Sequence, residues 1–139
     1  MMTFKTMAKT LCGAALLTSS TLAPAAAIDG SVPLLCAVTD TVSCDAGGGC
    51  VEGSAKSVNL PIFITVDVES KTAQSSRASG EQRTSAILSV HNDGASLVLL
   101  GVDQGAGWSV AIGKDTGRMT LAVSGDGIGY LALGACTPK

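Results

Sequence analysis

Residues 97–136, LVLLGVDQGAGWSVAIGKDTGRMTLAVSGDGIGYLALGAC, decide the fold class of this chain. They form short apolar segments interrupted by turn residues, mostly glycine and aspartate, roughly every ten positions. Large apolar side chains alternate with small or polar ones in 108–112 and again in 119–123. Because side chains two apart share one face of a strand, this alternation predicts half-buried strands joined by tight turns, which is an antiparallel meander.

The same rhythm continues toward the N-terminus. The expected strands are 34–42, 62–68, 84–90, 97–102, 108–112, 119–123 and 128–135. Strand 97–102 is apolar on both faces, which predicts the most enclosed strand, and Ala86, Leu88 and Val90 are expected on one face of strand 84–90. Residues 43–57, rich in glycine and serine, are expected to form a long loop. Seventeen glycines disfavour long helices.

Seven or eight short antiparallel strands predict an all-β fold, and the ends of the meander can be tied together by cysteines. A small closed or nearly closed barrel is therefore expected, because closure removes exposed strand edges. A two-sheet β-sandwich is the alternative, since alternation and turn spacing are the same in both architectures.

The N-terminus has the organisation of an export signal. Lys5 and Lys9 provide a basic start, and residues 11–22 form a short apolar stretch. The three alanines at 25–27 then offer a small-residue cleavage site before Ile28. The apolar stretch is too short to span a bilayer, so the sequence indicates removal of this segment rather than its retention as an anchor.

We therefore expect a cleavable signal peptide, 1–27, followed by a single β domain, 28–139, in the periplasm or outside the cell. No later segment approaches the length of a membrane span, so none is expected after cleavage. A domain of 112 residues buries about 65% of the surface of its unfolded chain. Such a core is thin, and covalent cross-links would support it.

Cysteines can supply that support. Of the five, one leaves with the signal, and Cys36, Cys44, Cys50 and Cys136 remain. An even number in an exported chain predicts two disulfides, in one of three connectivities. Cys44 and Cys50 flank the flexible run DAGGG and can close a small ring, which leaves Cys36 to join Cys136. A zinc site is disfavoured, because the spacing is too wide and no second close pair exists.

Composition argues against a nucleic-acid partner. Loss of Lys5 and Lys9 leaves seven basic and eleven acidic residues, a formal net charge of −4. The basic residues are scattered along the chain, and one Trp, one Tyr and two Phe provide no platform for stacking bases. We therefore expect no nucleic-acid binding.

The chain also lacks a catalytic constellation. A hydrolase triad needs a histidine beside a nucleophile and a carboxylate, and the single histidine, His91, lies at an expected hairpin end. Acids that could act as catalysts or calcium ligands fall mostly at expected turns: Asp93, Asp103, Asp115 and Asp126. Turn chemistry accounts for them. We expect no catalytic residues, no cofactor, no metal and no enzymatic activity.

Three segments near the C-terminus are distinctive: GWSVAI at 107–112, TGRMT at 116–120 and GACTP at 134–138. Together they resemble the ending of a family of small exported bacterial proteins of unknown function. The residues that carry this resemblance are turn, core and cysteine positions. The resemblance therefore implies an exported β protein and brings no active site with it.

Two functions follow from these expectations. In the first, the domain is a non-catalytic binding or inhibitor-like module that contacts another exported protein. In the second, the barrel interior holds a small apolar ligand. Trp108, Leu99, Met119 and Leu121 are either core or ligand-facing residues, and the narrow barrel favours the core. The sequence therefore ranks protein binding first, and it gives no indication of an oligomeric state.

Cleavage of the signal is directly testable. N-terminal sequencing of the protein recovered from the periplasm or the medium should begin at or close to Ile28, because the alanines before it fit a signal peptidase site. Recovery of the full-length chain solely from the cytosol would contradict this expectation.

Overall fold

A computed structural model describes residues 26–75 and 82–139, so the expected signal peptide lies almost entirely outside the described residues. These residues form nine strands and one short 3-10 helix, η1, which spans Ala55–Val58. The strands are β1 (Leu34–Asp45), β2 (Gly49–Gly53), β3 (Phe63–Asp67), β4 (Thr72–Ser75), β5 (Thr84–Asn92), β6 (Ser96–Asp103), β7 (Ala106–Gly113), β8 (Arg118–Ser124) and β9 (Ile128–Pro138). All seven expected strands are present, and β2 and β4 are additional.

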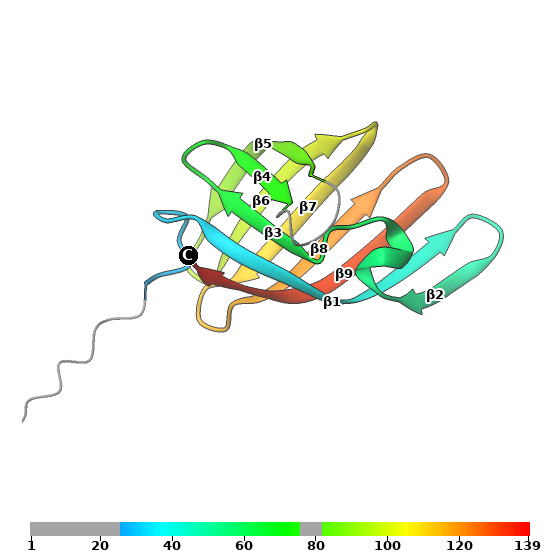
Figure 1. Ribbon diagram of the computed structural model, residues 1–139, viewed down its shortest axis with the longest axis horizontal. Helices are drawn as coiled ribbons and strands as arrows, with labels where there is room; N and C mark the ends of the chain where they lie inside the picture. The colour runs from blue at the N-terminus through cyan, green and yellow to red at the C-terminus, as the bar shows by residue number, and fades with distance from the viewer. Residues whose placement is uncertain (1–25, 76–81) are drawn as a thin grey trace, which may run out of the picture.

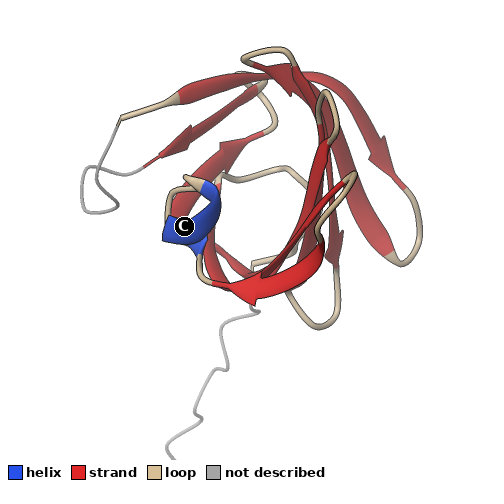
Figure 2. Cartoon of the chain, turned by 90° about the vertical axis from the view of Figure 1, so that its right-hand side faces the viewer, coloured by secondary structure: helices blue, strands red, loops and turns tan. Residues whose placement is uncertain are grey.

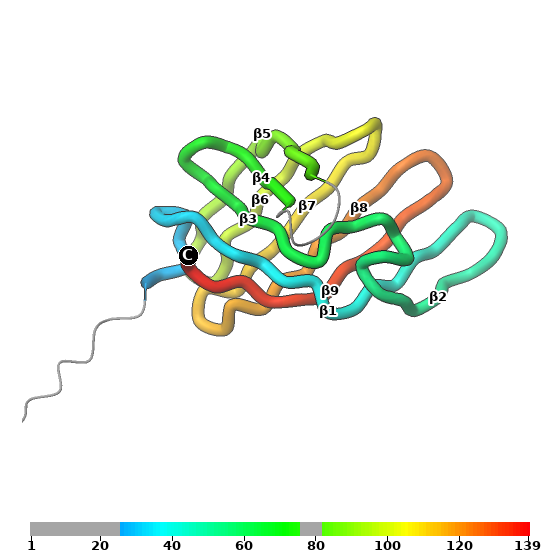
Figure 3. The backbone as a smooth tube through the Cα atoms, viewed as in Figure 1, coloured from blue at the N-terminus to red at the C-terminus, as the bar shows by residue number. Residues whose placement is uncertain are grey.

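Antiparallel pairing closes the sheet into a barrel (Figures 1 and 2). The strands follow the order β2-β1-β3-β4-β5-β6-β7-β8-β9, and β1 pairs in addition with β9. Figure 3 shows β9 running alongside β1. Eight strands thus form the closed barrel, and β2 extends it by pairing with the second half of β1. The predicted closed barrel is confirmed, and the β-sandwich alternative is wrong.

One extra residue in β1 changes which of its side chains point inward. Leu34, Cys36 and Val38 are buried, which is the alternation expected of a strand with one inward face. The register with β9 then shifts after Val38, which places Thr39 in a bulge, and the next buried residue is Thr41. Because a bulge adds a residue to one strand only, the alternation moves by one position. The Thr41 hydroxyl donates to the carbonyl of Ser54 at 3.1 Å, which satisfies it inside the barrel.

A second bulge corrects the expected orientation of β5. Ala86 and Leu88, predicted to share a face with Val90, are exposed, whereas Ile87 is buried. The register with β6 shifts between Ile87 and Ser89, so Leu88 is the extra residue and the alternation changes there. Val90 packs against the core beyond this point. A sequence pattern counts residues and does not reveal the bulge, so the predicted face was wrong.

Strand 97–102, expected to be the most enclosed because it is apolar on both faces, is buried on one face only. Leu97 and Leu99 are fully buried in β6, but the alternate side chains of Leu100 and Val102 are 38% and 55% exposed. A barrel wall covers only its inner face, and nothing packs over the outer face of β6 within the described residues. Apolar residues on both faces of a strand therefore do not imply burial of both.

The expected long loop at 43–57 is largely regular structure. β1 continues to Asp45, the chain turns over 46–48, β2 returns along β1, and η1 follows. The turn is held by the Asp45 carboxylate, which accepts the backbone N–H groups of Gly47 and Gly48. The residues read as loop-forming are thus the turn of a hairpin, and Figure 1 shows this hairpin extending beyond the barrel.

Both predicted disulfides are confirmed, and each joins directly opposed residues of paired strands. Cys36 of β1 opposes Cys136 of β9, and Cys44 of β1 opposes Cys50 of β2. The first bridge is buried and ties the first strand to the last, whereas the second lies at the surface of the β1–β2 hairpin. Disulfides persist in non-reducing compartments, which is where this fold belongs. The described part of the chain contains no helix with the length and apolarity that a membrane crossing needs.

The two bridges should differ in their effect on stability. They span sequence separations of 100 and 6 residues, and a longer loop restricts the unfolded chain more. The Cys36→Ala/Cys136→Ala double variant should therefore lose about 2 kcal/mol more unfolding free energy than Cys44→Ala/Cys50→Ala. Urea denaturation of both double variants and of the parent chain measures the difference. An equal or larger loss in the Cys44/Cys50 variant would contradict the expectation.

Candidate functional site

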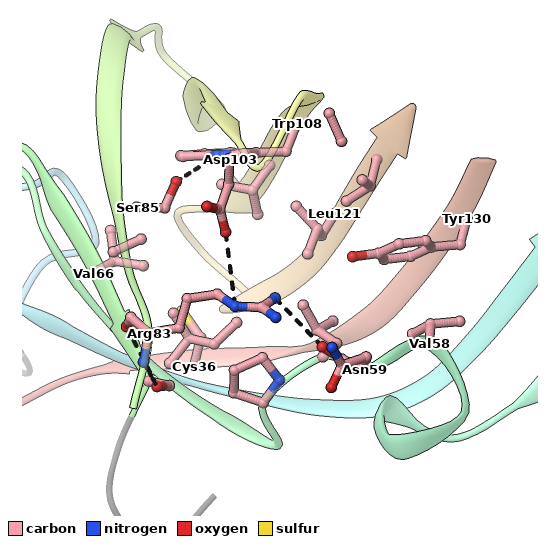
Figure 4. A pocket seen from close by; sticks show the side chains of 18 of the residues that line it. Cys36, Val58, Asn59, Val66, Arg83, Ser85, Asp103, Trp108, Leu121 and Tyr130 are labelled. Carbon is pink, nitrogen blue, oxygen red and sulfur yellow. Dashed lines mark hydrogen bonds and ion pairs between the residues drawn. The ribbon is translucent and has the colours of Figure 1, made fainter. Parts of the chain in front are cut away.

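The barrel is packed solid at one end and hollow at the other. At the packed end Leu97 and Ile112 oppose each other on β6 and β7, and both are fully buried together with Leu34. Ile28, which precedes β1, belongs to the same core cluster. At the other end a cavity of about 310 Å³ lies inside the barrel, and Figure 4 shows side chains that line it. Among the described residues, the exposed lining residues Asn59 and Gln104, the latter next to Asp103 at the end of β6, mark where it opens to solvent.

The four residues weighed as core or ligand-facing all line this cavity. Leu99, Met119 and Leu121 are buried, and Trp108 is partly buried and packs against the core. Each side chain thus contacts the core and also forms part of the cavity wall. The other lining residues are Cys36, Val58, Asn59, Leu60, Pro61, Ile64, Val66, Ala73, Ser75, Arg83, Ser85, Asp103, Gln104, Ala106, Val110, Val123 and Tyr130.

Trp108 forms one wall by lying across a glycine. It is paired with Gly101 of the neighbouring strand β6, and a Cβ at Gly101 would overlap the indole ring and the backbone oxygen of Ala86. With that space empty, the ring reaches past β6 to β5, where its Nε1 donates to the Ser85 hydroxyl at 2.9 Å. The indole is therefore fixed flat against the wall.

A polar group of side chains stands at the mouth. Arg83 directly precedes β5, Asp103 ends β6, and Asn59 follows η1 in the left-handed conformation, with φ 54°. The Arg83 Nε lies 3.9 Å from the Asp103 Oδ2, and its Nη1 donates to the Asn59 carbonyl at 3.4 Å. Figure 4 shows the guanidinium between these two partners, in front of the apolar wall.

Tyr130 of β9 completes the polar group. Its ring lines the cavity, and in Figure 4 its hydroxyl points toward the cavity interior. Burial raises the pKa of Tyr130, the positive charge of Arg83 opposes this, and the negative charge of Asp103 adds to it. The phenol therefore stays neutral at physiological pH and can donate a hydrogen bond.

Sequence reasoning missed this polar group. Asp103 was assigned to a turn, and Arg83, Asn59 and Tyr130 carried no signal, because they lie far apart in the chain and none forms a motif. The turn assignment holds for Asp93, whose carboxylate accepts N–H bonds from Ser96 and Ala95 that lower its pKa. His91 is exposed and bonded to Ser89, away from any carboxylate partner among the described residues.

The cavity combines an apolar wall with a small polar group, and metal-ligating side chains do not gather around it among the described residues. Within 26–75 and 82–139, His, Cys, Asp and Glu form no group that could hold a metal ion. An apolar chamber with a few polar side chains at its mouth is the usual form of a small-molecule site. Comparisons of the chain with protein families, with curated proteins and with solved structures find no match. The family resemblance of the closing strands stays a prediction.

The role of Gly101 can be tested with a matched glycine. Gly101→Ala should push the Trp108 ring from its place, break its bond to Ser85, and cost about 1–3 kcal/mol, as overpacking does. Trp108 is the only tryptophan, so its emission should move to longer wavelength. Gly107→Ala is the control, since the nearest atom to its Cβ would be 3.8 Å away. Unchanged emission and stability in Gly101→Ala would show that the position of the Trp108 ring does not require a glycine at 101.

Proposed function

We propose that this protein binds a small, mainly apolar molecule inside the open end of the barrel. The observation that carries the proposal is the cavity of about 310 Å³, walled by Leu99, Trp108, Met119 and Leu121 and open at the Asp103 end. Protein interiors normally contain few voids larger than a water molecule, so a hollow of this size is not ordinary packing. Water against such walls is poorly hydrogen-bonded, and its displacement by an apolar group is favourable.

The size of the cavity limits the ligand. At roughly 30 Å³ for a water-sized group, 310 Å³ holds about ten non-hydrogen atoms. The volume lies at the lower end of the range for ligand pockets, about 300–1,000 Å³. Compact metabolites or short alkyl chains fit, whereas large multi-ring ligands do not. This proposal takes the carrier function, ranked second from sequence, as the better supported one.

The proposed place of action is the periplasm or the cell exterior. Two disulfides and the leader-like residues before Ile28 support it. In that setting a barrel with one accessible end would take up, hold and release its ligand without chemical change. The buried Cys36–Cys136 bridge supports this role by holding the wall closed around the chamber.

A protein-binding module remains the second candidate because of the outer wall. Leu88, Leu100 and Val102 on the adjoining strands β5 and β6 are 66%, 38% and 55% exposed. Apolar side chains gathered on an exposed face are typical of contact surfaces. If an exported protein binds there, Leu100→Ser should abolish its capture from a periplasmic extract and leave binding inside the cavity intact. Capture that is indifferent to Leu100→Ser would count against this candidate.

Two valines of opposite orientation test the cavity proposal. Val123 lines the cavity beside Trp108, its partner on the neighbouring strand, whereas Val102 is exposed on the outer wall. Titration of the chain with 1-octanol should change the Trp108 emission saturably. Val123→Phe fills the chamber and should weaken this binding by about fivefold or more, as lost burial of one or two methylenes would. Val102→Phe should bind like the parent chain.

Calorimetry with the same probe provides an independent measurement. Binding to a preformed apolar cavity should show a negative heat-capacity change. The proposal is refuted if the parent chain shows no saturable binding of 1-octanol up to its solubility, or if Val102→Phe weakens binding as much as Val123→Phe.

A further inference from the structure

We propose that the natural ligand carries a carboxylate, which Arg83 binds at the mouth while an alkyl or similar apolar tail fills the chamber. This inference rests on the proposed function and names the ligand class. It follows from the donors of Arg83, from the neighbouring hydroxyl of Tyr130 and from the size of the cavity.

Among the described residues, the guanidinium of Arg83 uses only part of its donors. It carries five N–H groups, and its two contacts engage Nε, 3.9 Å from Asp103, and Nη1, 3.4 Å from the Asn59 carbonyl. Within the described residues the side chain has no further hydrogen-bond partner. Its exposed fraction is 24%, so the charge is partly withdrawn from water. A partly desolvated guanidinium with free N–H groups is a site for a planar anion, which it can bind through two parallel hydrogen bonds.

Asp103 does not form a hydrogen bond with the Arg83 guanidinium. A separation of 3.9 Å is too long for a hydrogen bond, so the two groups attract each other without sharing a proton. The carboxylate of Asp103 lies beside Nε and orients the guanidinium from one side. Nη2 and the second N–H of Nη1, whose first N–H donates to the Asn59 carbonyl, remain for a ligand, although the negative charge of Asp103 opposes an anion there. Whether the site prefers an anionic or a cationic head group therefore depends on which hydrogen-bond donors lie near Arg83.

Tyr130 adds a donor. Its neutral hydroxyl points into the same chamber as the guanidinium (Figure 4), and the charge of Arg83 acts on its ionisation. A carboxylate has two oxygens, one for the guanidinium and one for a second donor. Because Arg83 and Tyr130 line the same chamber, the inferred carboxylate would take one donor from each, whereas a cationic head would have Asp103 as its anionic acceptor. Of the three ionisable side chains that line the chamber, Arg83 and neutral Tyr130 offer donors and only Asp103 is an anionic acceptor, which favours an acid over an amine.

The tail is limited by the chamber. Room for about ten non-hydrogen atoms matches a compact acid or an alkyl acid of about eight carbons. Such a tail would lie against Leu121, Met119 and Trp108, below the level of Arg83. Long-chain acids would leave much of their length in water.

Three probes of equal chain length test the head group: octanoate, 1-octanol and octylamine, each titrated at pH 7.5 into the full chain with both disulfides formed. Octanoate should bind roughly tenfold tighter than 1-octanol, as hydrogen bonds to a charged group allow, and octylamine should bind most weakly. Arg83→Met should bring octanoate to within about twofold of 1-octanol while 1-octanol binding is unchanged. Arg118→Met, an exposed arginine at the start of β8, is the control and should behave like the parent.

Two further variants keep the test decisive if Arg83→Met folds poorly. Asp103→Asn removes the opposing charge and should tighten octanoate binding, and Tyr130→Phe removes one donor and should weaken it without affecting 1-octanol. The inference is overturned if octanoate binds no tighter than 1-octanol, if octylamine binds tightest, or if Asp103→Asn weakens octanoate. Those results leave the cavity proposal standing. Failure of all three probes to bind would refute the proposed function itself, and this inference with it.

Discussion

The pairing of β1 with β9 is the constraint on which the rest of the structure depends. It joins the first strand to the last, and without it the sheet would have two open edges and no interior. The contact is very close, since a Cβ at Gly134 of β9 would overlap the backbone of Ala37 on β1. The Cys36–Cys136 bridge lies within this pairing and makes the closure covalent. Closure in turn creates an inside, where a core and a chamber can exist.

Inside the closed wall, side-chain size decides where the barrel is filled. At the packed end Leu97, Ile112 and Leu34 belong to one core cluster and are fully buried. At the open end Gly101 opposes Trp108, so the indole lies flat against the wall instead of crossing the axis. A domain of this size buries little surface in its core, and the open chamber reduces the packing contacts further. The two disulfides offset this loss of stability by restricting the unfolded chain. The packed core and the open cavity thus occupy different ends of one barrel.

The polar group at the mouth gives the chamber its chemical character. An entirely apolar hollow would select ligands by size alone, because hydrophobic contact has no direction. Arg83, held between Asp103 and Asn59, adds direction and charge at one point of the rim. Tyr130 stays neutral beside it because burial disfavours the phenolate. This combination, an apolar wall with a few converging polar groups, is the usual form of small-molecule sites.

Local patterns in the sequence predicted seven of the nine described strands, several turns and the pairing of the cysteines, but not β2 or β4. Alternation at Trp108, Val110 and Ile112 predicts their common inner face, because two-residue periodicity is a property of the strand alone. The prediction failed at β5, where a bulge at Leu88 reversed the faces, since a bulge depends on the partner strand and leaves no mark in composition. The cavity and its mouth were decided only by the tertiary structure. Arg83, Asp103, Asn59 and Tyr130 come from separate elements, and only the curvature and closure of the whole sheet bring them around one opening.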